Sequence, residues 1–271
     1  MSFRFKKIAA VGALIGAIAL AGCDQKEKDP NHIKVGVIVG AEQQVAEAAQ
    51  KVAKDKYGLD VELVTFNDYV LPNEALSKGD IDVNAFQHKP YLDQQIKDRG
   101  YKLVSVGNSF VYPIAGYSKK IKSLDELQDG AQVAIPNDPT NLGRTLLLLQ
   151  KVGLIKLKDG VGLLPTSLDI TENPKHLKIV ELEAPQLPRS LDDQQIALAV
   201  INTTYASQIG LTPAKDGIFV EDKDSPYVNL IVAREDNKDA ENVKKFVKAY
   251  QSDEVNAEAN KVFNGGAVKG W

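Results

Sequence analysis

The sequence predicts an α/β protein built of two lobes, with a ligand cleft between them. Runs rich in β-branched residues alternate with helical segments along the chain, which is typical of α/β sheets with mainly parallel pairing. The 249 residues from Cys23 onward suffice for two modest lobes. Two segments, near residues 112–117 and 223–230, suit a chain that enters the second lobe and later returns to the first.

The elements of the first lobe follow from local composition. Helix 41–57 places small and branched apolar residues on one face. Pro113 and Gly116 lie in the apolar segment 111–117, so this segment is predicted to be an edge or crossing strand. The predicted elements are strands Ile33–Val39, Val61–Phe66, Ile81–Phe86, Leu103–Val106 and Val111–Tyr117, and helices Ala41–Tyr57, Leu71–Lys78 and Tyr91–Arg99.

The second half of the chain continues the alternation. The consecutive leucines 146–149 leave no polar face in helix Thr140–Val152, so this turn should be buried on most sides. Segment Ile196–Ile201 is apolar throughout, as in a strand buried on both faces. The other predicted elements are helices Leu124–Leu127, Tyr205–Ile209 and Val243–Tyr250, and strands Gln132–Ile135, Ile179–Leu182 and Tyr227–Val232. We expect residues 33–112 and 230–271 to form lobe 1, and residues 113–229 to form lobe 2.

Residues 1–22 have the features of a secretory signal peptide. Three basic residues precede an apolar stretch of 15 residues, which is short of the roughly 20 that a membrane-spanning helix needs. The stretch ends in Leu20-Ala21-Gly22-Cys23, which looks like a bacterial lipobox, and Cys23 is the only cysteine. The alternative is a plain cleavage site with an incidental cysteine.

The lipobox resemblance implies that Cys23 becomes the acylated first residue of the mature chain. More than one acyl chain is needed for stable anchoring in a bilayer, and acylation at both the sulfur and the amino group would supply them. Residues 23–32 are then a lipidated tether, because they are charged and contain Pro30. Asp24 resembles the signal that retains lipoproteins at the periplasmic face of the inner membrane; the alternative is an ordinary polar linker residue.

Composition excludes several classes of function. Without residues 1–22 the chain has 30 Lys and Arg against 36 Asp and Glu, a net charge of −6, which argues against nucleic-acid binding. Beyond Cys23 there is no cysteine for a disulfide or a thiolate metal site. The phosphate-binding, zinc-protease and serine-hydrolase motifs are absent. The sequence therefore predicts no enzyme, no cofactor and no metal.

Polar and aromatic side chains gather where the predicted strands end. Ligands of open α/β sheets bind at the carboxyl ends of the strands, so these side chains are candidates for one site. The candidates are Tyr69, Phe86, His88, Asn137, Asn141, Arg144, Asn202 and Asn229.

Arg144 is the most informative candidate. Asp138-Pro139-Thr140 is a helix-start signal with Thr140 as the expected N-cap, which would put Arg144 in the first turn. An arginine there opposes the helix dipole, so it does not serve helix stability. Together with free helix N–H groups it would bind a carboxylate, bidentate to the guanidinium. The alternative, a surface arginine paired with an acid, stays open.

The other candidates suit the rest of an amino-acid ligand. Asn202 and Asn229 can offer carbonyl oxygens to an ammonium group without burying a negative charge; the alternatives are a turn asparagine and a satisfied core residue. Tyr69, Phe86 and His88 could wall an apolar side chain, and a thioether gains from contact with ring edges. Ordinary core packing is the alternative for Phe86.

At this point the sequence resembles the methionine-binding lipoproteins of ABC importers, the MetQ type of the NlpA lipoprotein family, over nearly its whole length. The motifs that carry the resemblance are Lys34-Val35-Gly36-Val37, Phe66-Asn67-Asp68-Tyr69, residues 84–91 (NAFQHKPY), residues 136–144 (PNDPTNLGR) and residues 199–205 (AVINTTY).

This resemblance implies a periplasmic-binding-protein fold, type II-like, that closes on its ligand. It implies that Arg144 grips the carboxylate of methionine, that Asn202 and Asn229 hold the amino end, and that Tyr69, Phe86 and His88 surround the thioether. The implied partners are a membrane permease and its ATPases. D- and L-methionine both remain open, as do two other functions: a receptor for another small amino acid or dipeptide, and an envelope enzyme on the same scaffold.

Overall fold

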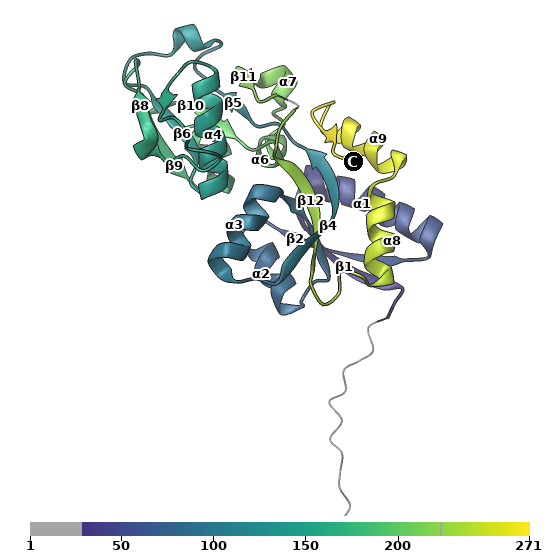
Figure 1. Cartoon of the computed structure of the whole chain (residues 1–271). Helices are drawn as coiled ribbons and strands as arrows, with labels where there is room; N and C mark the ends of the chain where they lie inside the picture. The colour runs from purple at the N-terminus through teal and green to yellow at the C-terminus, as the bar shows by residue number, and fades with distance from the viewer. Residues whose placement is uncertain (1–28, 223) are drawn as a thin grey trace, which may run out of the picture.

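The computed structural model describes residues 29–222 and 224–271, which form two α/β lobes (Figure 1). The predicted signal peptide, Cys23 and most of the predicted tether lie outside the described residues. Within the described part of the chain, no helix is both long enough and apolar enough to cross a membrane.

The first lobe is built on a six-stranded sheet with the order β13-β4-β12-β3-β1-β2. β1 lies parallel to β2 and β3, whereas β12 is antiparallel to both of its neighbours, β3 and β4. The strands are β1 (His32–Ile38), β2 (Asp60–Phe66), β3 (Val83–His88), β4 (Leu103–Val111), β12 (Val228–Arg234) and β13 (Val268–Lys269).

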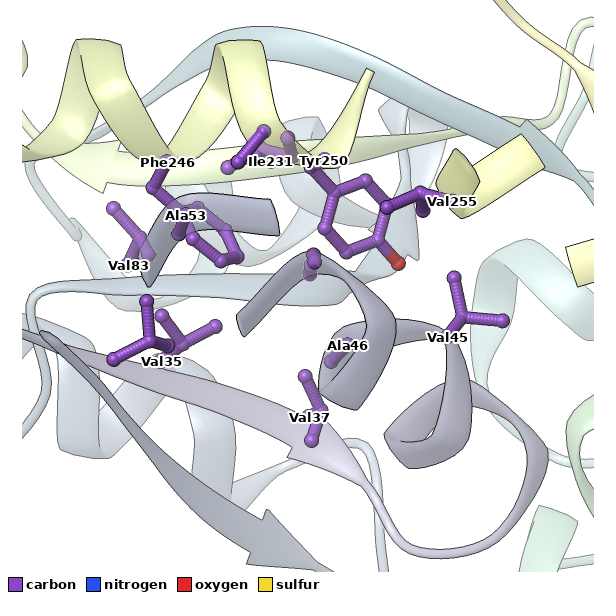
Figure 2. Packing of buried hydrophobic residues seen from close by; sticks show 14 of the residues in the cluster. Val35, Val37, Val45, Ala46, Ala53, Val83, Ile231, Phe246, Tyr250 and Val255 are labelled. Atoms are coloured by element: carbon purple, nitrogen blue, oxygen red, sulfur yellow. The ribbon is translucent and has the colours of Figure 1, made fainter. Parts of the chain in front are cut away.

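The core of this lobe lies between its sheet and its helices. Helix α1 turns Val45 toward Tyr250 of α8, and Ala53 of α1 lies beside Phe246 of α8 (Figure 2). Three of these side chains are fully buried and Tyr250 is 1% exposed. The helices are α1 (Ala41–Tyr57), α2 (Leu71–Lys78), α3 (Lys89–Arg99), α8 (Glu241–Tyr250) and α9 (Asp253–Val262).

The second lobe is built on a five-stranded sheet with the order β11-β5-β10-β6-β9. Its strands are β5 (Ala115–Tyr117), β6 (Gln132–Pro136), β9 (Lys178–Leu182), β10 (Ile196–Ile201) and β11 (Phe219–Val220), beside a small pair, β7 (Lys156–Leu157) and β8 (Ile170–Glu172). Its helices are α4 (Pro139–Lys151), α5 (Leu187–Ser190), α6 (Thr203–Gln208) and α7 (Pro213–Asp216), with short 3-10 turns at Leu124–Glu126, Ser167–Asp169 and Ala184–Gln186. Leu146, Leu148 and Leu149 of α4 are buried, as predicted, and Leu147 is half-buried.

The pairing departs from the mainly parallel sheets that were predicted, because both sheets are mixed. β12 returns from the second lobe and enters the first sheet between β3 and β4, antiparallel to both. β5 is likewise antiparallel to both of its neighbours in the second sheet. A strand that enters a sheet from the other lobe starts at the edge where the parallel strands end, so it runs in the direction opposite to theirs. The local alternation of strands and helices along the sequence does not reveal this.

Segment 111–117 proves to be a crossing and not an edge strand. Val111 ends β4 in the first sheet, and β5 begins in the second sheet at Ala115. β5 is internal, because β11 pairs with its outer side. A Cβ at Gly116 would lie 2.3 Å from two ring atoms of Phe219, so glycine is what allows β11 to pack this closely.

The sheet membership of the strands supports the predicted lobe boundaries, which we retain as a proposal. β4 leaves the first sheet at Val111 and β12 rejoins it at Val228. The two crossings, 112–114 and 221–227, therefore join the lobes at the positions expected of a hinge.

Candidate functional site

A cavity of about 350 Å³ lies where the two lobes meet. Its residues come from both lobes and from the first crossing. The first lobe contributes the loop before α2, the end of β3, α3 and β12, and the second lobe contributes α4, the turn after β10 and the start of α6. The lining residues are Tyr69, Phe86, Gln87, His88, Tyr91, Tyr112, Asn141, Arg144, Asn202, Thr203, Thr204 and Asn229. Seven of the eight candidate residues line this one cavity, whereas Asn137 is exposed and does not.

The start of helix α4 differs from the expectation. The N-cap is Asp138 and not Thr140, because the Asp138 carboxylate accepts a hydrogen bond from the Asn141 backbone N–H at 3.0 Å. Arg144 therefore lies in the second turn of the helix and not in the first. The protein's own aspartate thus already accepts a hydrogen bond from an N–H group at the start of this helix.

Arg144 is paired with an acid, but it is buried and not on the surface. Its side chain is 3% exposed. Nε donates to Glu221 Oε1 at 2.9 Å, and Nη2 donates to Glu221 Oε2 and to the Tyr112 carbonyl oxygen, the latter at 3.0 Å. The guanidinium carbon also lies 4.5 Å from the centre of the Tyr227 ring.

These hydrogen bonds involve only the Nε and Nη2 atoms of the Arg144 guanidinium, and Nη1 takes no part in them. Among residues 29–222 and 224–271, none accepts a hydrogen bond from Nη1. Glu221 occupies the Nε–Nη2 edge of the guanidinium in this arrangement, and the bidentate binding of a ligand carboxylate to Arg144 stays a prediction. The nitrogen available to a ligand is Nη1.

Asn141 connects the lobes behind the arginine. Its Oδ1 accepts from Asn202 Nδ2 at 2.9 Å and lies 3.3 Å from His88 Nε2. Its own Nδ2 donates to the Asp138 carboxylate at 2.9 Å. The side chain is thus fixed by contacts on every polar atom, and it holds both His88 and Asn202 in position.

His88 is a neutral aromatic group in this site. Its Nδ1 accepts from the Tyr91 backbone N–H at 3.1 Å, so the ring proton is on Nε2, which faces the acceptor Asn141 Oδ1. Burial, together with the nearby charge of Arg144, lowers the pKa of His88 to about 3. The ring therefore carries no charge near neutral pH.

The two candidate amides both present oxygen as the group left for a ligand. Asn202 donates through Nδ2 to Asn141, and Asn229 donates through Nδ2 to the Phe86 carbonyl oxygen at 3.0 Å. These donations fix which way each amide faces. Asn202 Oδ1 is buried and has no hydrogen-bond partner in the described chain, an arrangement that costs free energy unless a donor reaches it.

Aromatic rings form the apolar wall of the cavity. The ring centres of Tyr69 and Phe86 lie 5.9 Å apart, and those of Tyr69 and Tyr205 lie 5.0 Å apart. Phe86 is 4% exposed and belongs to the hydrophobic cluster that joins the lobes, so it serves core packing and lines the cavity at once.

Sequence reasoning missed several residues of the site. Tyr91, Thr203 and Thr204 lie inside the motifs already noted, so their position beside predicted residues was a usable signal. No feature of the sequence pointed to Tyr112 or Glu221. Both lie in the crossing segments, and only the folded chain brings these segments next to Arg144. In the part of the chain described, no group of three or more His, Cys, Asp or Glu is arranged to hold a metal ion.

The lobes also touch beside the cavity, where a buried acid lies. Glu42, in the first turn of α1, is 1% exposed and accepts a hydrogen bond from Thr204 Oγ1 of α6. Its other oxygen is buried without a partner in the described chain. Tyr205 O–H, donating to the Asn67 carbonyl oxygen at 3.3 Å, and Gln208 Nε2, donating to the Val39 carbonyl oxygen at 2.9 Å, complete this junction.

We expect Glu42→Gln to remove a pH dependence of stability. Burial raises the pKa of Glu42 to about 8 from 4.5. Between these values the folded protein keeps a proton that the unfolded chain releases, so the free energy of unfolding falls as pH rises. The advantage of Glu42→Gln over wild type should therefore grow between about pH 5 and pH 8, by up to about 1.4 kcal/mol per pH unit.

Urea denaturation at several pH values measures this difference. Glu47→Gln is the matched control, since Glu47 is exposed on the same helix and should leave the pH profile unchanged. Parallel profiles for Glu42→Gln and wild type would show that the buried carboxyl does not hold its proton.

The fold and this cavity together define a class of protein. Two α/β lobes, joined by two crossings around a small polar and aromatic cavity, are the architecture of periplasmic substrate-binding proteins. The chain belongs to the NlpA lipoprotein family, whose family model matches residues 33–271. The resemblance and the fold class predicted from the sequence are confirmed.

Relatives and solved structures agree with this assignment. The D-methionine-binding lipoprotein MetQ of Salmonella typhimurium is 91% identical over 271 residues, covering 100% of both chains. A crystal structure of the methionine-binding protein MetQ matches with 92% identity and a TM-score of 0.89, covering 90% of this chain and 99% of that one. A nutrient-binding protein of Burkholderia cenocepacia bound to methionine matches with 55% identity and a TM-score of 0.85, covering 88% and 100%.

Proposed function

We propose that this chain is the substrate-binding lipoprotein of an ATP-driven importer of methionine, in its D- or L-form. The proposal rests on the groups that line one cavity. It contains the guanidinium of Arg144, the unpartnered oxygen of Asn202 and a wall of aromatic rings. The names of the relatives, which are methionine-binding lipoproteins, support the same ligand.

The polar end of the cavity suits an amino-acid zwitterion. The ligand carboxylate would accept from Arg144 Nη1 in a charge-assisted hydrogen bond. The ligand ammonium would donate to Asn202 Oδ1, which the protein otherwise leaves unsatisfied, and to Asn229. Amide oxygens accept from an ammonium group without adding a buried negative charge.

The apolar end suits a flexible thioether. Tyr69, Phe86 and neutral His88 present ring faces and edges, and sulfur makes favourable contacts with ring edges. A single amino acid has both parts that this lining suits, a charged polar end and an apolar side chain.

Delivery requires that the bound and free forms differ in shape. The ligand would contact both lobes at once, and these contacts would stabilise the closed arrangement relative to an open one. The closed form would then dock on the membrane permease, whose ATPase subunits drive import. We propose that acylated Cys23 holds the protein at the periplasmic face of the inner membrane; loss of the protein from the membrane fraction in Cys23→Ser would check this.

The direct test is the identity of the ligand and its affinity. We expect mass spectrometry of freshly purified protein to detect methionine, chemically unchanged. Titration calorimetry on protein freed of ligand by unfolding and refolding should then show tight binding of D- or L-methionine.

Competing amino acids and dipeptides provide the contrast. If one of them binds while neither form of methionine does, the chain is a receptor for a different solute. A chemically altered ligand would favour an enzyme on the same scaffold.

A further inference from the structure

Strand β3 is irregular at Phe86, beside the ligand cavity. The register between β3 and β12 shifts here, so that Phe86 has no partner on β12 although Ala85 and Gln87 both have one. Such a β-bulge releases a backbone group from the ladder and redirects it. The Phe86 carbonyl oxygen accepts instead from the side chain of Asn229, whose Nδ2 lies 3.0 Å away. The bulge thus supplies the acceptor that leaves the Asn229 amide oxygen for a ligand.

Behind the bulge, the side-chain amides of Asn73, Asn84 and Gln87 form a closed cluster. Asn73, on α2, donates from Nδ2 to Gln87 Oε1 at 2.8 Å, and its Oδ1 accepts from Gln87 Nε2 at 2.7 Å and from Asn84 Nδ2 at 2.9 Å. Gln87 Nε2 also donates to Asn84 Oδ1 at 2.9 Å. Asn73 and Asn84 are fully buried, and Gln87 is 2% exposed. Every amide nitrogen and oxygen of the cluster therefore has a partner within it.

The amide cluster depends on the bulge. Side chains three positions apart in a regular strand point to opposite faces of the sheet, yet Asn84 and Gln87 contact each other and share Asn73 as a partner. The extra residue Phe86 between them brings both amides to one face. A regular strand would separate them and leave buried polar groups unpaired, which is costly. The cluster therefore stabilises the bulge.

We infer that Asn73 is a positioning residue for the ligand site. It holds the bulge through Asn84 and Gln87, and the bulge holds the Asn229 amide with its oxygen toward the ligand ammonium group. Asn73 is not among the described residues that line the ligand cavity, so it acts through its neighbours. The inference deepens the proposed function and rests on it, because the ammonium group is that of methionine.

A double-mutant cycle tests this inference, with titration calorimetry of the preferred form of methionine on full-length protein freed of ligand. Asn73→Leu removes the amide and keeps a side chain of similar size. We expect it to weaken binding by about tenfold, an ordinary coupling between residues of one network, because the Asn229 amide is no longer held. In protein that already carries Asn229→Ala, the same substitution should weaken binding by less than about twofold, because the group that Asn73 positions is gone.

Leu76→Ala is the matched control for a loss of stability in α2. Leu76 is fully buried on the same helix and packs in an apolar cluster, so the substitution destabilises α2 without removing an amide. Its effect on the affinity for methionine, whatever its size, should be the same with and without Asn229→Ala.

Two further variants of Asn73 complete the test. Asn73→Asp is the conservative one: at about pH 5 a buried aspartate is protonated, because burial raises its pKa, and its O–H can replace the N–H that donates to Gln87. It should then bind methionine within about twofold of wild type at the same pH. If Asn73→Leu does not fold, Asn73→Ser enters the same cycle with the same expectations, since its small side chain leaves room for water to reach the remaining amides.

Equal weakening by the Asn73 variant with and without Asn229→Ala overturns the inference, because Asn73 then only supports the fold. Wild-type affinity in that variant overturns it as well, and so does an Asn73→Asp protein that binds about tenfold more weakly than wild type at about pH 5. These results leave the proposed function intact. Wild-type protein that binds no form of methionine overturns the proposed function and this inference with it.

Discussion

Arg144→Ala is expected to weaken methionine binding by about 3 kcal/mol or more, about a hundredfold in dissociation constant or greater. The variant removes the only cationic group that lines the cavity in the described chain, so the ligand carboxylate would be buried without a partner. Titration calorimetry with the preferred form of methionine measures the loss.

The same variant should also lower stability, because it strands Glu221. That carboxylate is 13% exposed and is paired with Arg144 through two nitrogens. Arg189→Ala is the matched control, since Arg189 is exposed in the same lobe, and it should change neither binding nor stability. If Arg144→Ala folds and binds methionine as wild type does, the ligand carboxylate is held elsewhere and the proposed site is wrong.

Phe246→Ala is expected to reduce the free energy of unfolding by about 3–5 kcal/mol. The ring is fully buried between α8 and the first sheet, beside Tyr250 with ring centres 5.7 Å apart (Figure 2). The chain has no cysteine beyond Cys23, so no disulfide offsets the cavity that the substitution leaves.

Urea denaturation of the purified variant measures this effect. Lys248→Ala, on the exposed side of the same helix, changes a side chain without opening a cavity and should stay within about 0.5 kcal/mol of wild type. Phe246 does not line the ligand cavity, so the folded fraction should bind methionine normally. A stability loss below about 1 kcal/mol would mean that the core closes around the gap.

Local elements were predictable because local physics sets them. Helices 41–57 and 71–78 have their predicted ends, and a left-handed glycine, Gly58 or Gly79, follows each one. Strand Ile196–Ile201 also matches, since an apolar run of this length has few alternatives. Strands β11 and β13, with two residues each, were not predicted, because so short a pairing depends on the partner strand and not on its own sequence.

The sequence allowed us to predict which residues gather at the candidate site, but not how those residues contact one another. The carboxyl ends of strands meet at one edge of a sheet, so listing the polar residues found there brought together seven residues that line one cavity. The partner of Arg144 could not be found this way. Glu221 lies 77 residues further along the chain, in a crossing segment with no distinguishing composition.

The sequence by itself determined the α/β class, seven of the residues that line the cavity and the likeness to the NlpA lipoproteins, because periodicity, strand ends and motifs are local properties of a chain. The tertiary structure alone decided the mixed pairing of the sheets, the neutral state of His88 and the pairing of Arg144 with Glu221. Each of these depends on which segments meet when the chain crosses between lobes, and on the burial that the meeting creates.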